Sequence, residues 1–154
     1  KKNKQITDSI NYAQRIQNNL LPDHEELISV FPHSFVFFKP KDVVSGDFYW
    51  YKKIDKYFYL CVADCTGHGV PGAFMSIIGI DSIEQAILDK KITEPASILN
   101  FINHAVLSKT HLKDANEVID GMDVVFARFD LENKKVSLAG ARNPVIIVRN
   151  GEIL

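Results

Sequence analysis

The sequence has little that would mark a secreted, membrane-embedded or nucleic-acid-binding protein. Its two cysteines, Cys61 and Cys65, lie four residues apart at the end of an expected strand, which suits neither a disulfide framework nor a zinc knuckle. No hydrophobic run approaches the length of a transmembrane helix, and no signal peptide is visible. The formal net charge of -1 favours neither nucleic acid nor a membrane surface as a partner. We therefore expect a cytoplasmic domain with reduced, buried thiols.

What the chain does contain is enough apolar material for one folded core. Its 154 residues suit a single domain, and 46% of them are hydrophobic while 24% are charged. The first residue is Lys1 rather than Met, so we interpret the chain as part of a longer protein. We expect residues 1–21 to form a linker helix and residues 22–154 to form the globular domain.

The expected elements follow one another as a helix, three strands, two helices and at least three more strands. Helices are expected at 4–21, 71–90 and 94–109, and strands at 34–39, 47–53, 57–64, 123–130, 135–140 and 144–149. Phe74 should lie on the apolar face of the second helix, and Thr93 should cap the third. Asn150-Gly151 should close a hairpin. Strands joined by hairpins form mainly antiparallel sheets, so the fold class is α+β, and apolar residues on both strand faces suggest a layered sandwich.

The apolar stripe of the N-terminal helix allows two interpretations. Ile6, Ile10, Ala13, Gln17 and Leu20 recur at spacings of four and three, which is a short heptad-like pattern interrupted by the polar Gln17. The helix is either an amphipathic helix packed on its own domain or the end of a coiled coil that arrives from an upstream domain.

Two aspartates face each other if a two-residue hairpin turn lies at Asp55-Lys56. In that register Asp47 lies opposite Asp64, and directly opposed side chains share one face of a sheet. Two carboxylates this close repel unless a cation lies between them, and Mg²⁺ and Mn²⁺ prefer carboxylate and carbonyl oxygens. A general acid/base pair and a pair of turn aspartates are the other interpretations. The shared register and the flanking glycines favour a metal site.

The stretch "VADCTGHGVPGAFMS" at 62–76 places a glycine-rich loop directly after Asp64. It is not a P-loop, because no Gly-Lys-Ser/Thr follows, and its spacing is not the dinucleotide fingerprint. Gly46 precedes Asp47, and glycines allow backbone to approach a metal and its waters closely. His68 is either a metal ligand or acid, or a residue whose hydrogen bond fixes the loop, and we favour the second interpretation.

Four stretches in this order resemble a known family. They are "VVSGDFYW" (43–50), "VADCTGHGVPGAFMS" (62–76), "DGMDVVFARFD" (120–130) and "LAGARNPVIIVRNGEI" (138–153). They resemble the SpoIIE/RsbU-type branch of the metal-dependent PPM protein serine/threonine phosphatases, from about Asn18 onward. The resemblance implies a sandwich of two mainly antiparallel β-sheets flanked by helices. It also implies two Mn²⁺ or Mg²⁺ ions that activate a water against phosphoserine or phosphothreonine.

The resemblance also assigns roles to individual residues. Asp47 and Asp64 match metal ligands, and Asp64 matches the catalytic aspartate that bridges both ions. Cys65 matches the residue that binds a metal through its backbone carbonyl. The positions expected near the site are Gly46, Gly67, His68 and Asp123, although Asp123 falls where related sequences often carry threonine.

The family's remaining metal aspartates, in a Ser-Asp-Gly motif and a final Asp-Asp pair, lie beyond the end of this chain. We therefore expect a partial phosphatase domain, incomplete at its C-terminus, that by itself binds metal weakly or not at all and shows little activity. Asp120 is a further carboxylate that could be recruited. Lys39, Lys41 and Arg142 are candidate phosphate contacts, although we favour solvated surface charge for each.

The resemblance further implies partners. These are an upstream sensor domain, a second copy joined through the N-terminal helix, and a phosphorylated regulatory protein of the anti-sigma factor antagonist type as substrate. Two alternatives stay open: a non-catalytic phosphatase-like module for dimerisation or docking, and a hydrolase that acts on a small phosphorylated metabolite.

Overall fold

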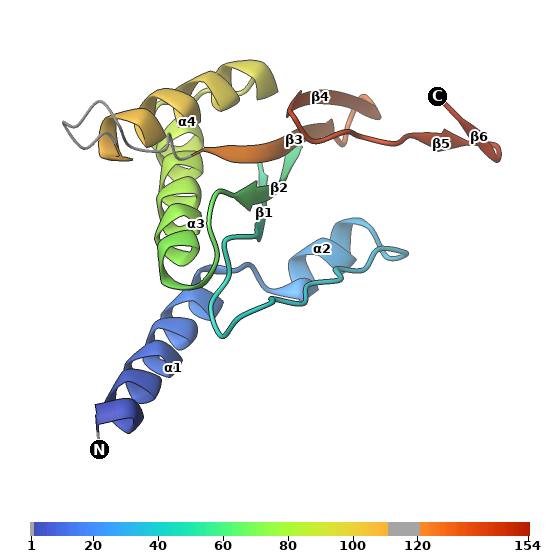
Figure 1. Ribbon diagram of the computed structural model, residues 1–154. Coiled ribbons are helices and arrows are strands. Elements are labelled where there is room, and N and C mark those ends of the chain that lie inside the picture. Colours follow the sequence, from blue (N-terminus) through green and yellow to red (C-terminus); the bar gives the residue numbers. More distant parts are fainter. Residues whose placement is uncertain (1, 111–120) are drawn as a thin grey trace.

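A computed structural model describes residues 2–110 and 121–154 of the chain (Figure 1). The helices are α1 (Lys2–Leu20), α2 (His24–Val30), α3 (Gly69–Glu84), the π-helical turn η1 (Gln85–Asp89) and α4 (Pro95–Thr110). The strands are β1 (Phe48–Ile54), β2 (Tyr57–Cys65), β3 (Met122–Asp130), β4 (Lys135–Ala141), β5 (Val148–Arg149) and β6 (Glu152–Ile153). The α+β class is confirmed. No described helix is both long and apolar enough to cross a membrane.

Strands β1 to β4 form one antiparallel sheet in sequence order, while β5 and β6 pair separately. The first hairpin turns at Asp55 and Lys56 and pairs Tyr49 with Val62, as the sequence predicts. Asp55 lies in the left-handed region with φ 52°, a conformation that aspartate adopts more readily than most residues. The register of the first two strands is therefore the expected one.

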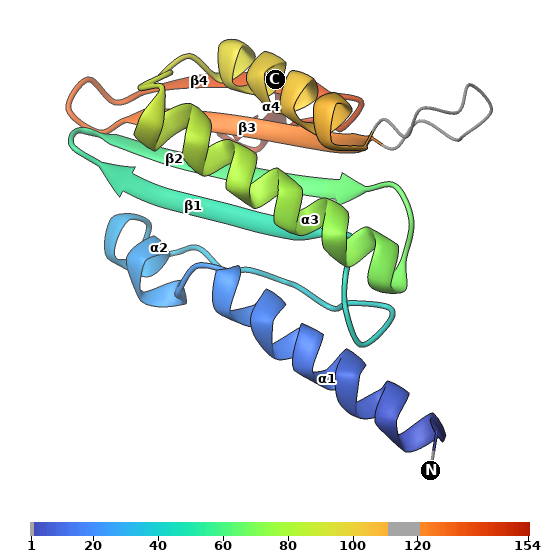
Figure 2. The ribbon, with the colours of Figure 1, turned by 90° about the vertical axis from the view of Figure 1, so that its left-hand side faces the viewer.

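The sheet has two different faces. On the first, which we call the helix face, Trp50, Cys61 and Phe126 pack under α3 and α4 with Ile83 and Ile98. Figure 2 shows α3 and α4 lying across this face.

The second face, which we call the carboxylate face, carries Tyr49, Tyr51, Leu60 and Val62. Here α2 covers only one end of the sheet, where Leu27 packs with Tyr51 and Phe58. One face thus holds the main core, and the other is partly open.

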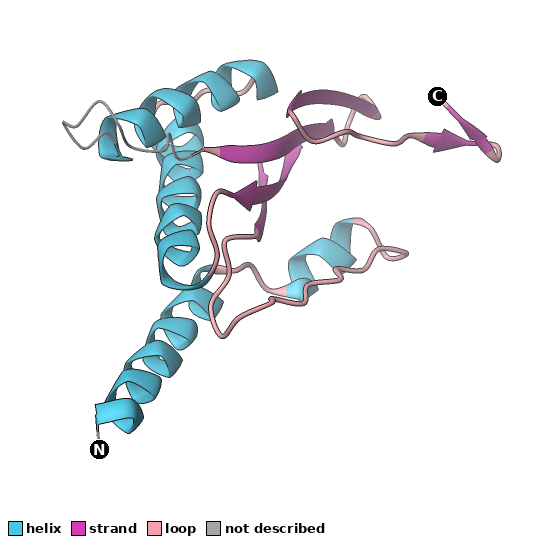
Figure 3. Ribbon diagram, viewed as in Figure 1, coloured by secondary structure: helices cyan, strands magenta, loops and turns pink. Residues whose placement is uncertain are grey.

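Of the expected strands, the one at 34–39 is not formed and the one at 144–149 is shorter than predicted. Residues 34–39 belong to the long loop between α2 and β1 (Figure 3), and Phe35 and Phe37 are 87% and 82% exposed. Aromatic residues favour a strand only where another strand pairs with them, and no described strand pairs with this segment. Of residues 144–149, only Val148–Arg149 is paired, although the turn at Asn150 and Gly151 forms as expected, with φ of 53° and 82°.

The helices also differ from expectation in detail. Phe74 is exposed, because α3 packs through its small residues Gly72, Ala73 and Ser76, which permit close approach. Helix α4 starts at Pro95, one residue later than predicted, and the carbonyl of Glu94 accepts the backbone N–H of Ile98. The prediction that Thr93 caps the helix is wrong, because its carbonyl accepts from Arg128 instead.

Helix α2 was not predicted at all. Asp23 caps it by accepting a hydrogen bond from the backbone N–H of Glu25, and Glu25 and Glu26 lie in its first turn. An N-cap aspartate followed by two acidic residues is an available signal for a helix start. The helix is short, at 7 residues, so its apolar periodicity is weak.

Gln17 is the one buried side chain described in α1, and it ties that helix to the domain. Its Nε2 donates to the carbonyl of Ser45 at 2.6 Å and to Oγ of Ser76 at 2.8 Å, and its Oε1 accepts from the backbone N–H of Ser45 at 2.9 Å. The other end of the helix, residues 2–9, is exposed and projects from the body (Figure 2). The helix therefore packs on its own domain at its C-terminal end only.

We expect Gln17→Leu to lower the free energy of unfolding by about 2–4 kcal/mol, because it leaves the buried polar groups of Ser45 and Ser76 without these partners. Urea denaturation measures this change, with the fluorescence of Trp50, the single tryptophan, as the probe of unfolding. Gln5→Leu, the same substitution on the exposed half of α1, is the matched control. Equal losses in the two variants would contradict the role given to Gln17.

Candidate carboxylate site beside the glycine loop

Asp47 and Asp64 lie next to each other at the end of the first hairpin. The ladder runs to the pair of Phe48 and Ala63, so the next opposed positions are the two aspartates. Burial raises the pKa of Asp47, and a side-chain hydrogen bond with Asp64 and the negative charge of Asp64 raise this pKa further. The predicted juxtaposition of these two carboxylates is confirmed.

A third carboxylate borders this pair. Asp123 in β3 lies opposite Asp64 in β2, so their side chains project from the same face. Asp47, Asp64 and Asp123 therefore form a row across β1, β2 and β3. Asp123 also forms an ion pair with Arg142: Nε of Arg142 lies 3.5 Å from Oδ1 of Asp123. Over residues 2–110 and 121–154, no three Asp, Glu, His or Cys side chains converge closely enough to hold a metal.

The thiol of Cys65 points away from these carboxylates. It is buried in the core on the helix face. Burial raises its pKa to about 12, and the negative charges of Asp64 and Asp47 contribute to the same shift. Only the backbone of Cys65 is therefore available on the side of the aspartates.

Three glycines bring the loop against the segment that leads into β1. A Cβ atom added to Gly72 would lie 2.6 Å from the carbonyl oxygen of Gly67 and 3.0 Å from Cα of Gly46. A Cβ on Gly46 would lie 2.8 Å from the same oxygen, and Gly67 itself has φ of +90°. We call Gly46, Gly67 and Gly72 the glycine contact. At these glycines two backbone segments touch without room for a side chain. Gly72 was not among the predicted site residues, although a glycine near the start of a helix is an unusual choice.

His68 joins the glycine-rich loop to Asp42 in the segment before β1. Its Nδ1 lies 3.0 Å from Oδ2 of Asp42, and its side chain is 78% exposed. It occupies the N-cap position of α3 without a side-chain cap bond. The contact agrees with the loop-fixing interpretation, because its partner is Asp42 rather than Asp47 or Asp64.

A cavity of about 950 Å³ lies over the carboxylate face. Asp47 and Asp64 contribute to its wall, together with Tyr49, Val62 and residues 30–39 at the end of α2 and in the following loop. Its lining further includes Lys39 and Asn143, while Lys41 is absent from the described lining.

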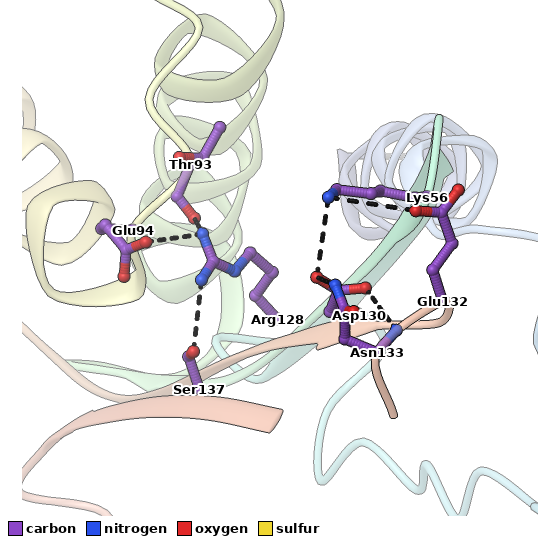
Figure 4. A network of polar contacts seen from close by, with 8 residues as sticks. All are labelled: Lys56, Thr93, Glu94, Arg128, Asp130, Glu132, Asn133 and Ser137. Carbon is purple, nitrogen blue, oxygen red and sulfur yellow. Dashed lines mark hydrogen bonds and ion pairs between the residues drawn. The ribbon is translucent and has the colours of Figure 1, made fainter. Parts of the chain in front are cut away.

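A second polar cluster lies at the opposite end of the β2–β3 ladder (Figure 4). Arg128 donates through Nη1 to Oε1 of Glu94 at 2.6 Å and to the carbonyl of Thr93 at 3.2 Å, and through Nη2 to Oγ of Ser137 at 3.3 Å. Its guanidinium also lies 4.8 Å from the ring centre of Tyr57. These contacts hold the start of α4 to the sheet and are structural.

Asp120, the remaining carboxylate that the sequence singled out, lies outside the described residues.

Comparisons with known proteins agree with this fold. The family model for stage II sporulation protein E (SpoIIE) matches residues 54–153. Among solved structures, the SiaA-PP2C domain of Pseudomonas aeruginosa is similar, with 35% sequence identity and a TM-score of 0.77. That similarity covers 90% of this chain and 55% of the solved chain, so this chain spans about half the length of that structure. No curated protein matches.

We expect Gly72→Ala to lower the free energy of unfolding by about 1–3 kcal/mol, because its methyl group would push the loop away from Gly46. Gly121→Ala is the matched control, since the nearest atom to its added methyl group, Oγ1 of Thr66, lies 4.0 Å away. Urea denaturation compares the two variants. If both lose the same stability, the glycine contact is not a close-packed one.

Proposed function

This chain belongs to the SpoIIE family of PP2C-like phosphatase domains. From that premise we propose that it is a metal-dependent domain that hydrolyses phosphoserine or phosphothreonine in a protein. The contact between Asp47 and Asp64 beside the glycine loop is the observation that carries this proposal. Because the chain spans 55% of the solved relative, the activity is proposed for the protein at its natural length.

The oxygen donors at the site fit a hard divalent cation. Two ionised carboxylates in contact repel, and a cation between them removes that cost. Carboxylate and carbonyl oxygens suit Mg²⁺ or Mn²⁺, whereas softer metals prefer thiolates. Asp47 and Asp64 would hold the metal, with Asp64 shared between two ions and the backbone carbonyl of Cys65 as a further donor.

When bound, ions of this kind lower the pKa of a water and polarise the phosphoryl group. The residues of the chain provide the fixed positions for that chemistry. The paired strands hold Asp64 between Asp47 and Asp123, so the backbone positions of the three aspartates are fixed relative to one another. The glycine contact restrains the backbone on the side of Gly46 and on the side of the loop. Tyr49 and Val62 form an apolar surface beside the carboxylates.

The second candidate function is a non-catalytic phosphatase-like module for dimerisation or docking. It is favoured by the absence, within the described parts of the chain, of a third converging metal-ligating side chain. This candidate predicts a folded protein without metal-dependent hydrolysis.

We also propose the partners that the family resemblance implies. The substrate would be a phosphorylated regulatory protein of the anti-sigma factor antagonist type in the cytoplasm. An upstream sensor domain would reach the site through α1, because Gln17 bonds to Ser45, two residues before Asp47. Ile6 and Ile16 are exposed on α1 and offer an apolar surface to a second copy.

Asp64→Asn should lower kcat/KM for Mn²⁺-dependent hydrolysis of a phosphoserine peptide by at least about 10³-fold, because it removes one carboxylate charge from the proposed metal site. The assay uses the protein at its natural length. Asp55→Asn, at the first hairpin turn, is the matched control, since asparagine also tolerates its positive φ. Activity that survives Asp64→Asn would refute the metal-bridging role. Metal-independent activity, or none, would refute the proposed function.

The 154-residue chain by itself should bind Mn²⁺ weakly or not at all, because two carboxylates and one carbonyl form only part of an octahedral ligand set. Isothermal titration calorimetry of this chain measures the affinity directly. Two tight Mn²⁺ sites would show that these residues are sufficient, and Asp47→Asn would then identify the site by reducing the affinity.

A further inference from the structure

A tight turn after β4 places Arg142 beside the row of carboxylates. Arg142 has φ of 61°, in the left-handed region, and forms an isolated parallel bridge with Val124 of β3. A Cβ atom on Gly140 would lie 2.9 Å from the carbonyl oxygen of Asn143, so the turn is closed tightly. The turn therefore returns the chain from the edge strand β4 to the end of β3, where Asp123 lies.

An arginine is an unusual residue for this backbone conformation. Glycine, asparagine or aspartate adopts the left-handed region at a lower cost. Residues held in such conformations cluster at functional sites, where the surrounding structure enforces them. Lys91 and Lys134 adopt the same conformation, so it is the contacts of Arg142 that indicate what its side chain does.

The guanidinium of Arg142 is available to a ligand. Its side chain is 85% exposed, and its contact to Asp123 is 3.5 Å long. An exposed ion pair of this length is weak, so it does not prevent the guanidinium from binding a stronger anion. Asp123 lies opposite Asp64, which places this cation at the same end of the sheet as the candidate metal ligands.

Charge explains why the site needs such a cation. Asp47, Asp64 and Asp123 repel the doubly negative phosphoryl group of a phosphoserine or phosphothreonine wherever a bound cation does not offset their charge. A guanidinium presents paired N–H donors that match two phosphate oxygens. Asn143, the next residue, lines the same cavity as Asp47 and Asp64, so the turn itself borders the proposed site.

We propose that Arg142 is a specificity-determining residue that binds the phosphoryl group of the substrate, and that Asp123 orients its guanidinium. This inference rests on the proposed phosphatase function. The ligand is a phosphomonoester dianion, and the contact is to the phosphoryl oxygens rather than to the peptide.

Arg142→Asn tests the proposal, because asparagine removes the cation and still tolerates the left-handed backbone. The Mn²⁺-loaded protein at its natural length is assayed with a phosphoserine peptide and with p-nitrophenyl phosphate, and inorganic phosphate is used as a competitive inhibitor. We expect KM for both substrates and the inhibition constant of phosphate to rise by about 10- to 100-fold, with kcat changed by less than about threefold. Arg142→Lys should recover part of the loss, because it restores the charge without the paired donors.

Arg149→Asn, in the exposed hairpin of β5 and β6, is the matched control and should change none of these constants. If Arg142→Asn also changes none, or raises KM for the peptide alone, the proposed phosphoryl contact is wrong while the phosphatase function stands. A fall in kcat alone would overturn it as well. No Mn²⁺-dependent hydrolysis by the unsubstituted protein would overturn the proposed function and this inference with it.

Discussion

The two-residue turn at Asp55 and Lys56 is the constraint on which the site depends. Side chains alternate between the faces of a strand, so a slip of one residue in the first hairpin would move Asp47 to the opposite face from Asp64. The same slip would exchange the core residue Trp50 with the partly open surface around Tyr49 and Tyr51. Because one face must be buried under α3 and α4, packing of the core enforces the same register that brings the two aspartates together.

Backbone packing then positions the loop relative to that hairpin. The glycine contact leaves no space for side chains between the loop and the lead-in to β1, and Gln17 satisfies both polar groups of the Ser45 backbone at the same point. Asp47 thus follows a segment that is fixed from two sides. A cluster of negative charge is costly for a fold to maintain, and restraints of this kind are what keep such carboxylates from moving apart.

The sequence was sufficient for features set by local rules. The first hairpin, its register and the Asn150-Gly151 turn all follow from turn length and side-chain alternation. It was insufficient where distant segments meet. The opposition of Asp64 and Asp123 spans two helices, and the bond between His68 and Asp42 joins two loops, so no local pattern encodes either contact. Gln17 looked like an interruption of an apolar stripe, because a buried hydrogen-bonding role depends on partners elsewhere in the chain.

The hydrogen bonds of Gln17 also have a consequence for the order of folding. They join residues that are 28 and 59 positions apart, whereas the first hairpin closes over only a few residues. Contacts of high sequence separation carry a larger loop-closure entropy and form after local ones. Helix α1, whose N-terminal half buries no side chain, is therefore expected to dock last and to detach first. Its release would expose the lead-in to Asp47 while the sheet stays paired.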